Sequence, residues 1–149
     1  MTDILLDCWI PGRPRPQGSM RHVGKGHMAY SATTIAHRNR LIEVLATAWC
    51  GRVPIDEAVA LSVDMYFHRP KAHYGTGRNA AVLKESAPLH KTTPLDTDKG
   101  CRLVADGLTI AGVIRDDALI VELLGRKCYD EGPERTHVQL RRMPTVGER

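Results

Sequence analysis

The chain has 149 residues, of which 42% are hydrophobic and 26% are charged, a balance typical of a soluble globular protein. This length predicts a single domain over residues 1–149 with its own hydrophobic core. No apolar run approaches the roughly 18 residues of a membrane helix, and the N-terminus lacks the basic start and cleavage site of a signal peptide. The four cysteines are widely spaced, which argues against a zinc site and a disulfide scaffold. We therefore expect a cytoplasmic protein with reduced cysteines.

The positive charge is unevenly distributed. Between Pro11 and Ile42 there are six basic residues and no acidic one, whereas the remainder of the chain has 15 basic and 17 acidic residues. A basic segment on a nearly neutral body is typical of a protein that binds a polyanion, and nucleic acid is the most abundant candidate. The alternative interpretation is a solubilising surface loop.

The first half of the chain predicts a strand, a loop and a helix. Ile4 to Ile10 reads as a strand, and the Pro-, Gly- and Arg-rich segment 11–30 reads as an extended loop in which binding residues can lie. Ser31 is a suitable N-cap for a helix that ends near Trp49. The apolar residues expected on its buried face are Ile35, Ile42, Leu45 and Trp49.

A second strand and a second loop follow. Apolar residues alternate from Val59 to Phe67, as in a half-buried strand. Segment 68–93 is long, irregular and basic, and Tyr74 within it could stack on a base. Loops of this length in a compact domain are usually functional or disordered.

The segment from Pro94 to Asp117 holds the most informative pattern. Asp96 and Asp98 precede a predicted helix with Asp98 as its N-cap, and Asp116 and Asp117 follow it. The stripe expected to be buried is Cys101, Val104, Ala105 and Leu108. A helix that folds back in this way brings distant acids together, and their oxygens would suit Mg²⁺. The alternative is a helix cap and a pair of solvated acids at a turn.

Two further strands complete the prediction. Ala118 to Cys128 reads as a strand with Ile120 and Glu122 on one face and Leu119, Val121 and Leu123 on the other. A last strand contains Thr136, Val138 and Leu140. The order β-α-β-α-β-β predicts an α+β fold with a mixed sheet and about two main helices.

The residues around the acids resemble those of the RusA family of Holliday junction resolvases, and the phage and prophage members in particular. The motifs that carry this resemblance are Pro94-Leu95-Asp96-Thr97-Asp98-Lys99, Arg102, Ala105-Asp106-Gly107-Leu108, Arg115-Asp116-Asp117 and Val121. Upstream, Gly12-Arg13-Pro14-Arg15-Pro16 with Arg21 resembles the family's Gly-x-Pro-x-Pro loop. Arg69-Pro70-Lys71-Ala72-His73-Tyr74-Gly75 is similar to a segment of the phage members. The resemblance covers roughly residues 5–129.

The resemblance implies an endodeoxyribonuclease that resolves four-way junctions by paired nicks, as a homodimer, in a bacterial cell or phage-infected host during DNA recombination and repair. It places the metal-binding carboxylates at Asp96, Asp98 and Asp117 and implies Mg²⁺ as cofactor, with Mn²⁺ able to substitute. The family's catalytic lysine falls on Arg102, which keeps the charge but is a poor proton donor, and Lys99 stands where many members have Asn. Asp106 is expected to be a hydrogen-bonding residue of the helix. If the chain from Ala118 onward is extended, Asp116 and Asp117 should point opposite ways. The candidate DNA-binding residues of the two basic segments are Arg13, Arg15, Arg21, Lys25, Arg69, Lys71, His73 and Arg78.

Two other functions stay open on the residues alone. A non-catalytic DNA-binding protein would explain the arginine at position 102. A phosphatase that uses Asp96-Thr97-Asp98 is a weaker alternative, because the preceding residues are polar and end in Pro94 rather than forming an apolar strand.

Overall fold

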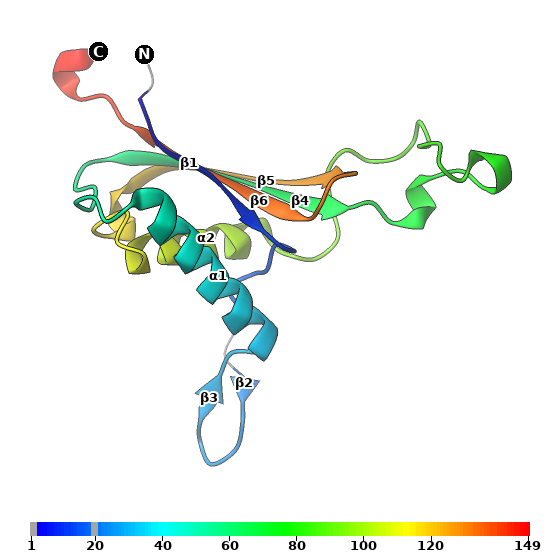
Figure 1. The fold of residues 1–149 in the computed structure, drawn as a ribbon, viewed down its shortest axis with the longest axis horizontal. Helices are drawn as coiled ribbons and strands as arrows, with labels where there is room; N and C mark the ends of the chain where they lie inside the picture. The colour runs from blue at the N-terminus through cyan, green and yellow to red at the C-terminus, as the bar shows by residue number, and fades with distance from the viewer. Residues whose placement is uncertain (1–2, 19–20) are drawn as a thin grey trace.

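A four-stranded mixed sheet organises the fold (Figure 1). The structure, a computed structural model, describes residues 3–18 and 21–149. The central strand β4 (Val59–His68) pairs antiparallel with β6 (Arg135–Arg142) and parallel with β5 (Ile120–Asp130). Strand β1 (Ile4–Pro11) pairs antiparallel with β6, which gives the order β1-β6-β4-β5.

Two helices, α1 (Ala32–Trp49) and α2 (Thr97–Ile110), cover one face of this sheet (Figure 1). The alternation along β4 sends one set of side chains toward them, and those from Val59 to Phe67 at every second position are at most 2% exposed. The predicted α+β fold with a mixed sheet and two main helices is confirmed. No helix of the described residues is long and apolar enough to span a membrane.

Helix α1 begins where the sequence predicted, and two of the residues expected on its buried face, Leu45 and Trp49, are buried. The Ser31 hydroxyl accepts a hydrogen bond from the Thr34 N–H at 3.2 Å and caps the helix. Ile35 was expected in the core and is instead 42% exposed. The buried stripe has i, i+4 spacing, which keeps one face of a helix toward the sheet, and consists of His37, Leu41, Leu45 and Trp49.

The start of β5 differs from the predicted alternation. Residues 117–119 form a 3₁₀ turn, and the register of β5 on β4 shifts between the pairs Val59–Ile120 and Ala60–Glu122. Leu123 pairs with Leu61, so the extra residue returns Leu123 to the same face as Ile120. The prediction that Ile120 and Leu123 lie on opposite faces was therefore wrong.

Both basic segments contain a part that projects from the body of the protein (Figure 1). Residues 21–29 form a small hairpin of β2 (Arg21–His22) and β3 (Met28–Ala29) beyond the start of α1. Residues 69–90 form an arm that extends from the end of β4 and doubles back, with the Gly75 N–H bonded to the Val82 carbonyl at 2.9 Å.

Candidate functional site

Helix α2 carries the first acids. Its N-cap is Asp96 rather than the predicted Asp98, which lies in the first turn near the positive end of the helix dipole. The Asp96 side chain makes no capping hydrogen bond and instead pairs with Lys99 Nζ at 3.2 Å. The predicted stripe of α2 is buried at Cys101, Val104 and Leu108, with Ala105 partly buried against the core.

The chain returns from α2 to β5 through a fixed turn. Gly112 adopts a φ of 74°, which favours glycine, and Val113 and Ile114 behind it are buried. The Asp116 carboxylate then accepts a hydrogen bond from the Ala118 N–H at 2.8 Å and starts the 3₁₀ turn. Because this segment is not extended, the prediction that Asp116 and Asp117 point opposite ways does not apply to it.

One pocket of about 310 Å³ is lined both by residues of α2 and by a residue of the turn that follows it. Asp98 and Arg102 from the helix and Asp117 from the turn all line it. Its apolar wall includes Ile120 and Leu123, which the register shift places on the same face. The structure therefore joins three of the predicted catalytic residues. The remaining two, Asp96 and Lys99, pair with each other and do not line this pocket.

The acids at the turn repel one another. A hydrogen bond shared with Asp116, with a smaller effect of burial, raises the pKa of Asp117, and the charges of Asp116 and Asp106 add to this shift. The pKa of Asp116 is lowered, chiefly by the hydrogen bond from Ala118. A cation beside Asp117 would relieve this excess of negative charge.

The donor chemistry of the pocket suits a hard divalent cation. Such ions prefer carboxylate oxygens and keep several water ligands, and Asp98 and Asp117 supply two carboxylates. Among the residues that the structure describes, no three His, Cys, Asp or Glu side chains already form a metal-binding group. Asp96 as a third ligand stays a prediction, since its side chain would have to leave Lys99.

The N-terminal basic loop lies against the start of α2. The Gln17 N–H donates to the Lys99 carbonyl at 3.0 Å and fixes the loop there. Arg13 and Arg15 from this loop and Arg40 from α1 line a second pocket of about 200 Å³. An added Cβ at Gly12 would lie 3.0 Å from Arg40 Nη1, so glycine leaves room for that guanidinium.

Two residues of this second pocket were not predicted. Arg40 and His37 are not among the candidate site residues of the sequence, and His37 is only 8% exposed. Burial lowers the pKa of His37, and the charges of Arg15 and Arg40 lower it further. Arg40 is three residues after His37 on α1, so the two side chains lie on the same face of the helix. This spacing could have been read from the sequence.

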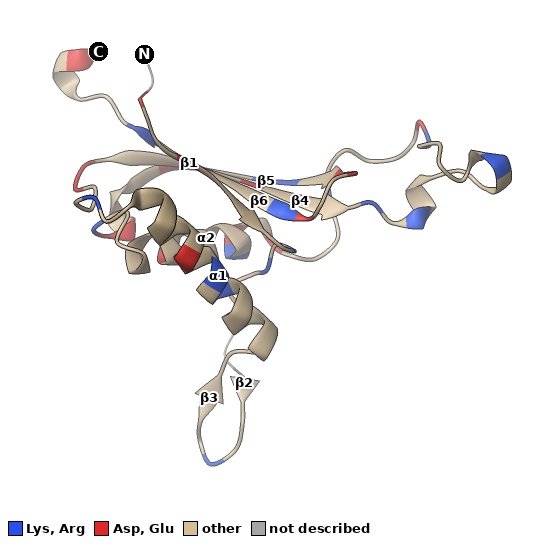
Figure 2. Cartoon of the chain, viewed as in Figure 1, with Lys and Arg blue, Asp and Glu red and all other residues tan. Residues whose placement is uncertain are grey.

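The other predicted DNA-binding residues lie on the two projections (Figure 2). Lys25 is exposed in the hairpin, and Lys71 and Arg78 are exposed on the arm. Arg69 Nη1 donates to the Pro88 carbonyl at 2.8 Å, and His73 packs edge-on against Tyr129 with ring centroids 4.7 Å apart. Arg21 is in β2, but its side chain falls outside the part that the structure describes.

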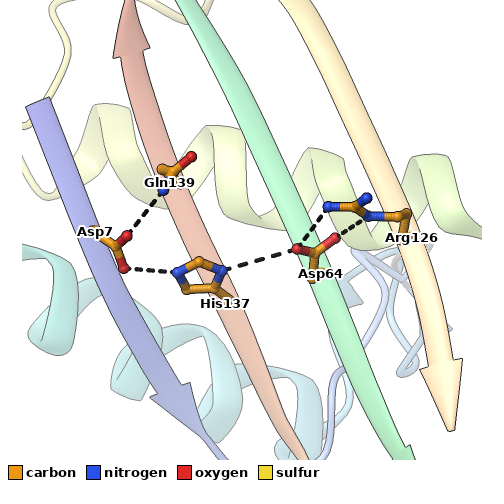
Figure 3. A network of polar contacts seen from close by, with 5 residues as sticks. All are labelled: Asp7, Asp64, Arg126, His137 and Gln139. Carbon is orange, nitrogen blue, oxygen red and sulfur yellow. Dashed lines mark hydrogen bonds and ion pairs between the residues drawn. The ribbon is translucent and has the colours of Figure 1, made fainter. Parts of the chain in front are cut away.

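A separate cluster of charges lies on the sheet face away from the helices (Figure 3). Arg126 donates to both oxygens of the buried Asp64, at 2.6 and 3.1 Å. His137 Nε2 is 2.7 Å from Asp7 Oδ1, and Gln139 donates to the other Asp7 oxygen at 2.9 Å. These two bonds lower the pKa of Asp7. Each carboxylate is already satisfied, so the cluster ties the four strands together and does not resemble the acidic pocket.

Comparison with known proteins identifies the family of the chain. The family described as "Endodeoxyribonuclease RusA" matches residues 11–141 of the chain. Among curated proteins, none matches the chain. The matched span contains both basic projections, helix α2 and the acidic turn. The chain is thus a member of the RusA family of endodeoxyribonucleases.

Proposed function

We propose that this endodeoxyribonuclease resolves four-way DNA junctions by paired symmetric nicks, with a divalent cation held at the acidic pocket. The observation that carries the proposal is the convergence of Asp98, Arg102 and Asp117 on one pocket beside basic loops. Family membership supports a nuclease that acts on branched DNA.

The residues of the pocket have distinct roles in this proposal. Asp98 and Asp117 would hold Mg²⁺ or Mn²⁺, with Asp96 joining them if it leaves Lys99. When bound at these carboxylates, such a cation would lower the pKa of a water ligand and offset the charge of the phosphate. Arg102 faces the same pocket and stabilises the charge that develops on the phosphoryl oxygens. Since arginine rarely gives up a proton, Arg102 acts through its charge rather than as a general acid.

The basic loops bind the arms of the junction through phosphates, which gives affinity without sequence readout. Arg13 and Arg15 belong to the loop that contacts Lys99 through Gln17. The arm contributes Arg69, Lys71 and Arg78. Paired nicks require two pockets in matching geometry, which a two-fold homodimer provides. A dimer mass in solution would support this part of the proposal.

A binding protein without nuclease activity is the second candidate, and Arg102 in place of the family's lysine is the observation that favours it. The phosphatase alternative loses support, because Asp96 begins a helix and does not end a strand.

Cleavage of synthetic junctions tests the proposal. In millimolar Mg²⁺ the protein should nick opposite strands of a four-way junction, and Asp98→Asn should lower the rate about a hundredfold or more while junction binding is kept. Calorimetric titration with Mn²⁺ should show weaker binding to Asp98→Asn than to the wild type. Asp3→Asn, which removes an exposed carboxylate before β1, is the matched control.

Each candidate function has its own outcome. Equal rates for the wild type and Asp98→Asn would remove the acids from the mechanism. Tight junction binding without nicking in saturating Mg²⁺ or Mn²⁺ would favour the binding protein.

A further inference from the structure

A third pocket, of about 510 Å³, is basic and lies where β4 ends and the arm begins. It is lined by Phe67 of β4, by Arg69 at the start of the arm, by Tyr129 of β5 and by Lys91 and Thr93 from the segment that returns from the arm. Arg13 closes it from the N-terminal loop and also lines the pocket beside Arg40. The two basic pockets are thus neighbours that share one guanidinium.

Lys91 is the unusual residue of this pocket because it is only 9% exposed. Its backbone N–H donates to the Lys127 carbonyl at 3.0 Å, so the residue is anchored to β5. Its Nζ donates to Thr93 Oγ1 and lies 5.3 Å from the centroid of the Phe67 ring. Within residues 3–18 and 21–149, no carboxylate lies within ion-pair distance of this ammonium.

The neighbouring cations, Arg13 and Arg69, each lie beside an aromatic ring. Arg13 lies 5.8 Å from the centroid of Phe67, and Arg69 lies 5.6 Å from that of Tyr129. The only carboxylate paired with any of the three among the described residues is Glu134, which is 3.4 Å from Arg13 Nη1. Burial lowers the pKa of Lys91, the charges of Lys127 and Arg13 lower it further, and the charge of Glu134, which is outside ion-pair distance, offsets a smaller part of this shift.

A buried ammonium without a counter-ion is an unfavourable arrangement that an incoming anion would relieve. The pocket offers room for such an anion, with three cations around it and an aromatic wall. The acidic pocket is lined by Leu123 near the start of β5, and Tyr129 of the basic pocket lies six residues further along this strand, about 20 Å away. An anion in the basic pocket is therefore separate from the phosphate that the acids would hold.

We propose that Lys91, with Arg13 and Arg69, forms a binding site for a backbone phosphate of the junction DNA at a distance from the cleaved phosphate. The proposal rests on the junction-cleaving function proposed above and assigns a role to a residue outside the candidate site residues. Lys91 is here a positioning residue: it holds the DNA by this phosphate and does not touch the reacting atoms.

The variant Lys91→Met separates this role from a role in folding. Methionine keeps an apolar side chain against Phe67 and removes the buried charge. Because an uncompensated charge is removed, the melting temperature should stay equal or rise. Junction affinity in Ca²⁺, measured by fluorescence anisotropy, should fall about tenfold, and the slope of log affinity against log salt should fall by about one.

Chemical changes in the DNA identify the ligand. Single phosphates are replaced by neutral methylphosphonates at successive positions on both sides of the cleavage site. One replacement, away from the cleaved phosphate, should weaken wild-type binding and have no effect in Lys91→Met. Inorganic phosphate, added at constant ionic strength, should not raise the melting temperature of the wild type. A rise equal to that given by the junction would indicate that the pocket binds free phosphate or a nucleotide, and would overturn the DNA assignment.

The control removes a cation from the other end of the sheet. Arg142 pairs with Val59 at the start of β4, whereas the pocket lies at the end of that strand, so Arg142→Met should leave affinity nearly unchanged. If Lys91→Met fails to fold, Lys91→Gln replaces it with the same expected losses. A wild-type protein that binds no branched DNA would overturn both proposals. A wild type that cuts junctions while Lys91→Met binds them equally well would overturn the phosphate site alone.

Discussion

Gly125 lies where β5 passes beneath the first turns of α2. A Cβ at this position would lie 2.5 Å from Cys101 Sγ and 2.7 Å from Thr97 Cγ2. Its φ is not in the left-handed region, so alanine could adopt the backbone conformation there. The substitution Gly125→Ala therefore tests the close packing of the helix on the strand, and not the backbone freedom of glycine.

The size of the effect follows from these contacts. Ordinary carbon contacts are about 3.5–4.0 Å, so the helix and the strand must separate by about 1 Å. Overpacking of this kind lowers the free energy of unfolding by about 1–3 kcal/mol. Replacing a strand glycine by alanine raises it by about 0.5–1 kcal/mol. The net loss should be about 0.5–2 kcal/mol, which lowers the melting temperature by roughly 1–8 °C at this chain length.

The same displacement reaches the acidic pocket. Asp98 is on the first turn of α2, and Asp117 begins the 3₁₀ turn that leads into β5. A change of about 1 Å in the distance between catalytic groups can lower a rate about a hundredfold. Gly125→Ala should therefore lower the rate of junction cleavage both at low and at saturating DNA concentrations. The affinity for DNA, which depends on the basic loops, should be unchanged.

Thermal denaturation and junction cleavage together check this reasoning. Gly147→Ala is the control, since a Cβ there has no neighbour within 4 Å. In the background of Thr97→Ser and Cys101→Ala, which removes both contacting atoms, Gly125→Ala should cost much less stability than in the wild type. If Gly125→Ala melts and cleaves like the wild type, or costs the same in both backgrounds, the packing argument is wrong.

Two further predictions concern thiols and pH. Burial raises the pKa of Cys101 to about 11, so a thiol reagent at pH 8 should modify the exposed Cys50 quickly and Cys101 only after unfolding; comparable rates in the folded protein would contradict its burial. The pKa of Glu148 is lowered from 4.5 to about 2, chiefly by Arg142. Its stabilising contact should be complete above pH 4.5 and be lost as the pH falls toward 2, and an NMR titration should show this shift and its disappearance in Arg142→Met.

Local patterns predicted most of the fold because few alternatives satisfy them. The alternation from Val59 to Phe67 fixed the central strand, and the hydroxyl of Ser31 fixed the start of α1. The buried face of α1 was predicted correctly at Leu45 and Trp49 but not at its start, because Ile35 has an apolar side chain and His37 does not. A basic neighbourhood that accepts a buried histidine exists only after the loop has packed on the helix.

The candidate site was partly predictable for a similar reason. A helix followed by a glycine turn returns Asp117 toward Asp98, so their common pocket follows from the order of elements. The Asp96–Lys99 pair has i, i+3 spacing and could have been read from the sequence. The burial of Lys91 could not, since it depends on Phe67 and Lys127 from two different strands.

The pairing of β1 with β6 has a consequence for how the protein is made. Pro11 pairs with Arg135, so 124 positions of chain separate the two partners. At about 5–20 residues per second, the N-terminal strand waits roughly 6–25 s on the ribosome before its partner is synthesised. Such distant pairing also makes folding slow after release, in the range of milliseconds to seconds. The nascent protein therefore exposes an unpaired strand edge for most of its synthesis, at the stage when chaperones act.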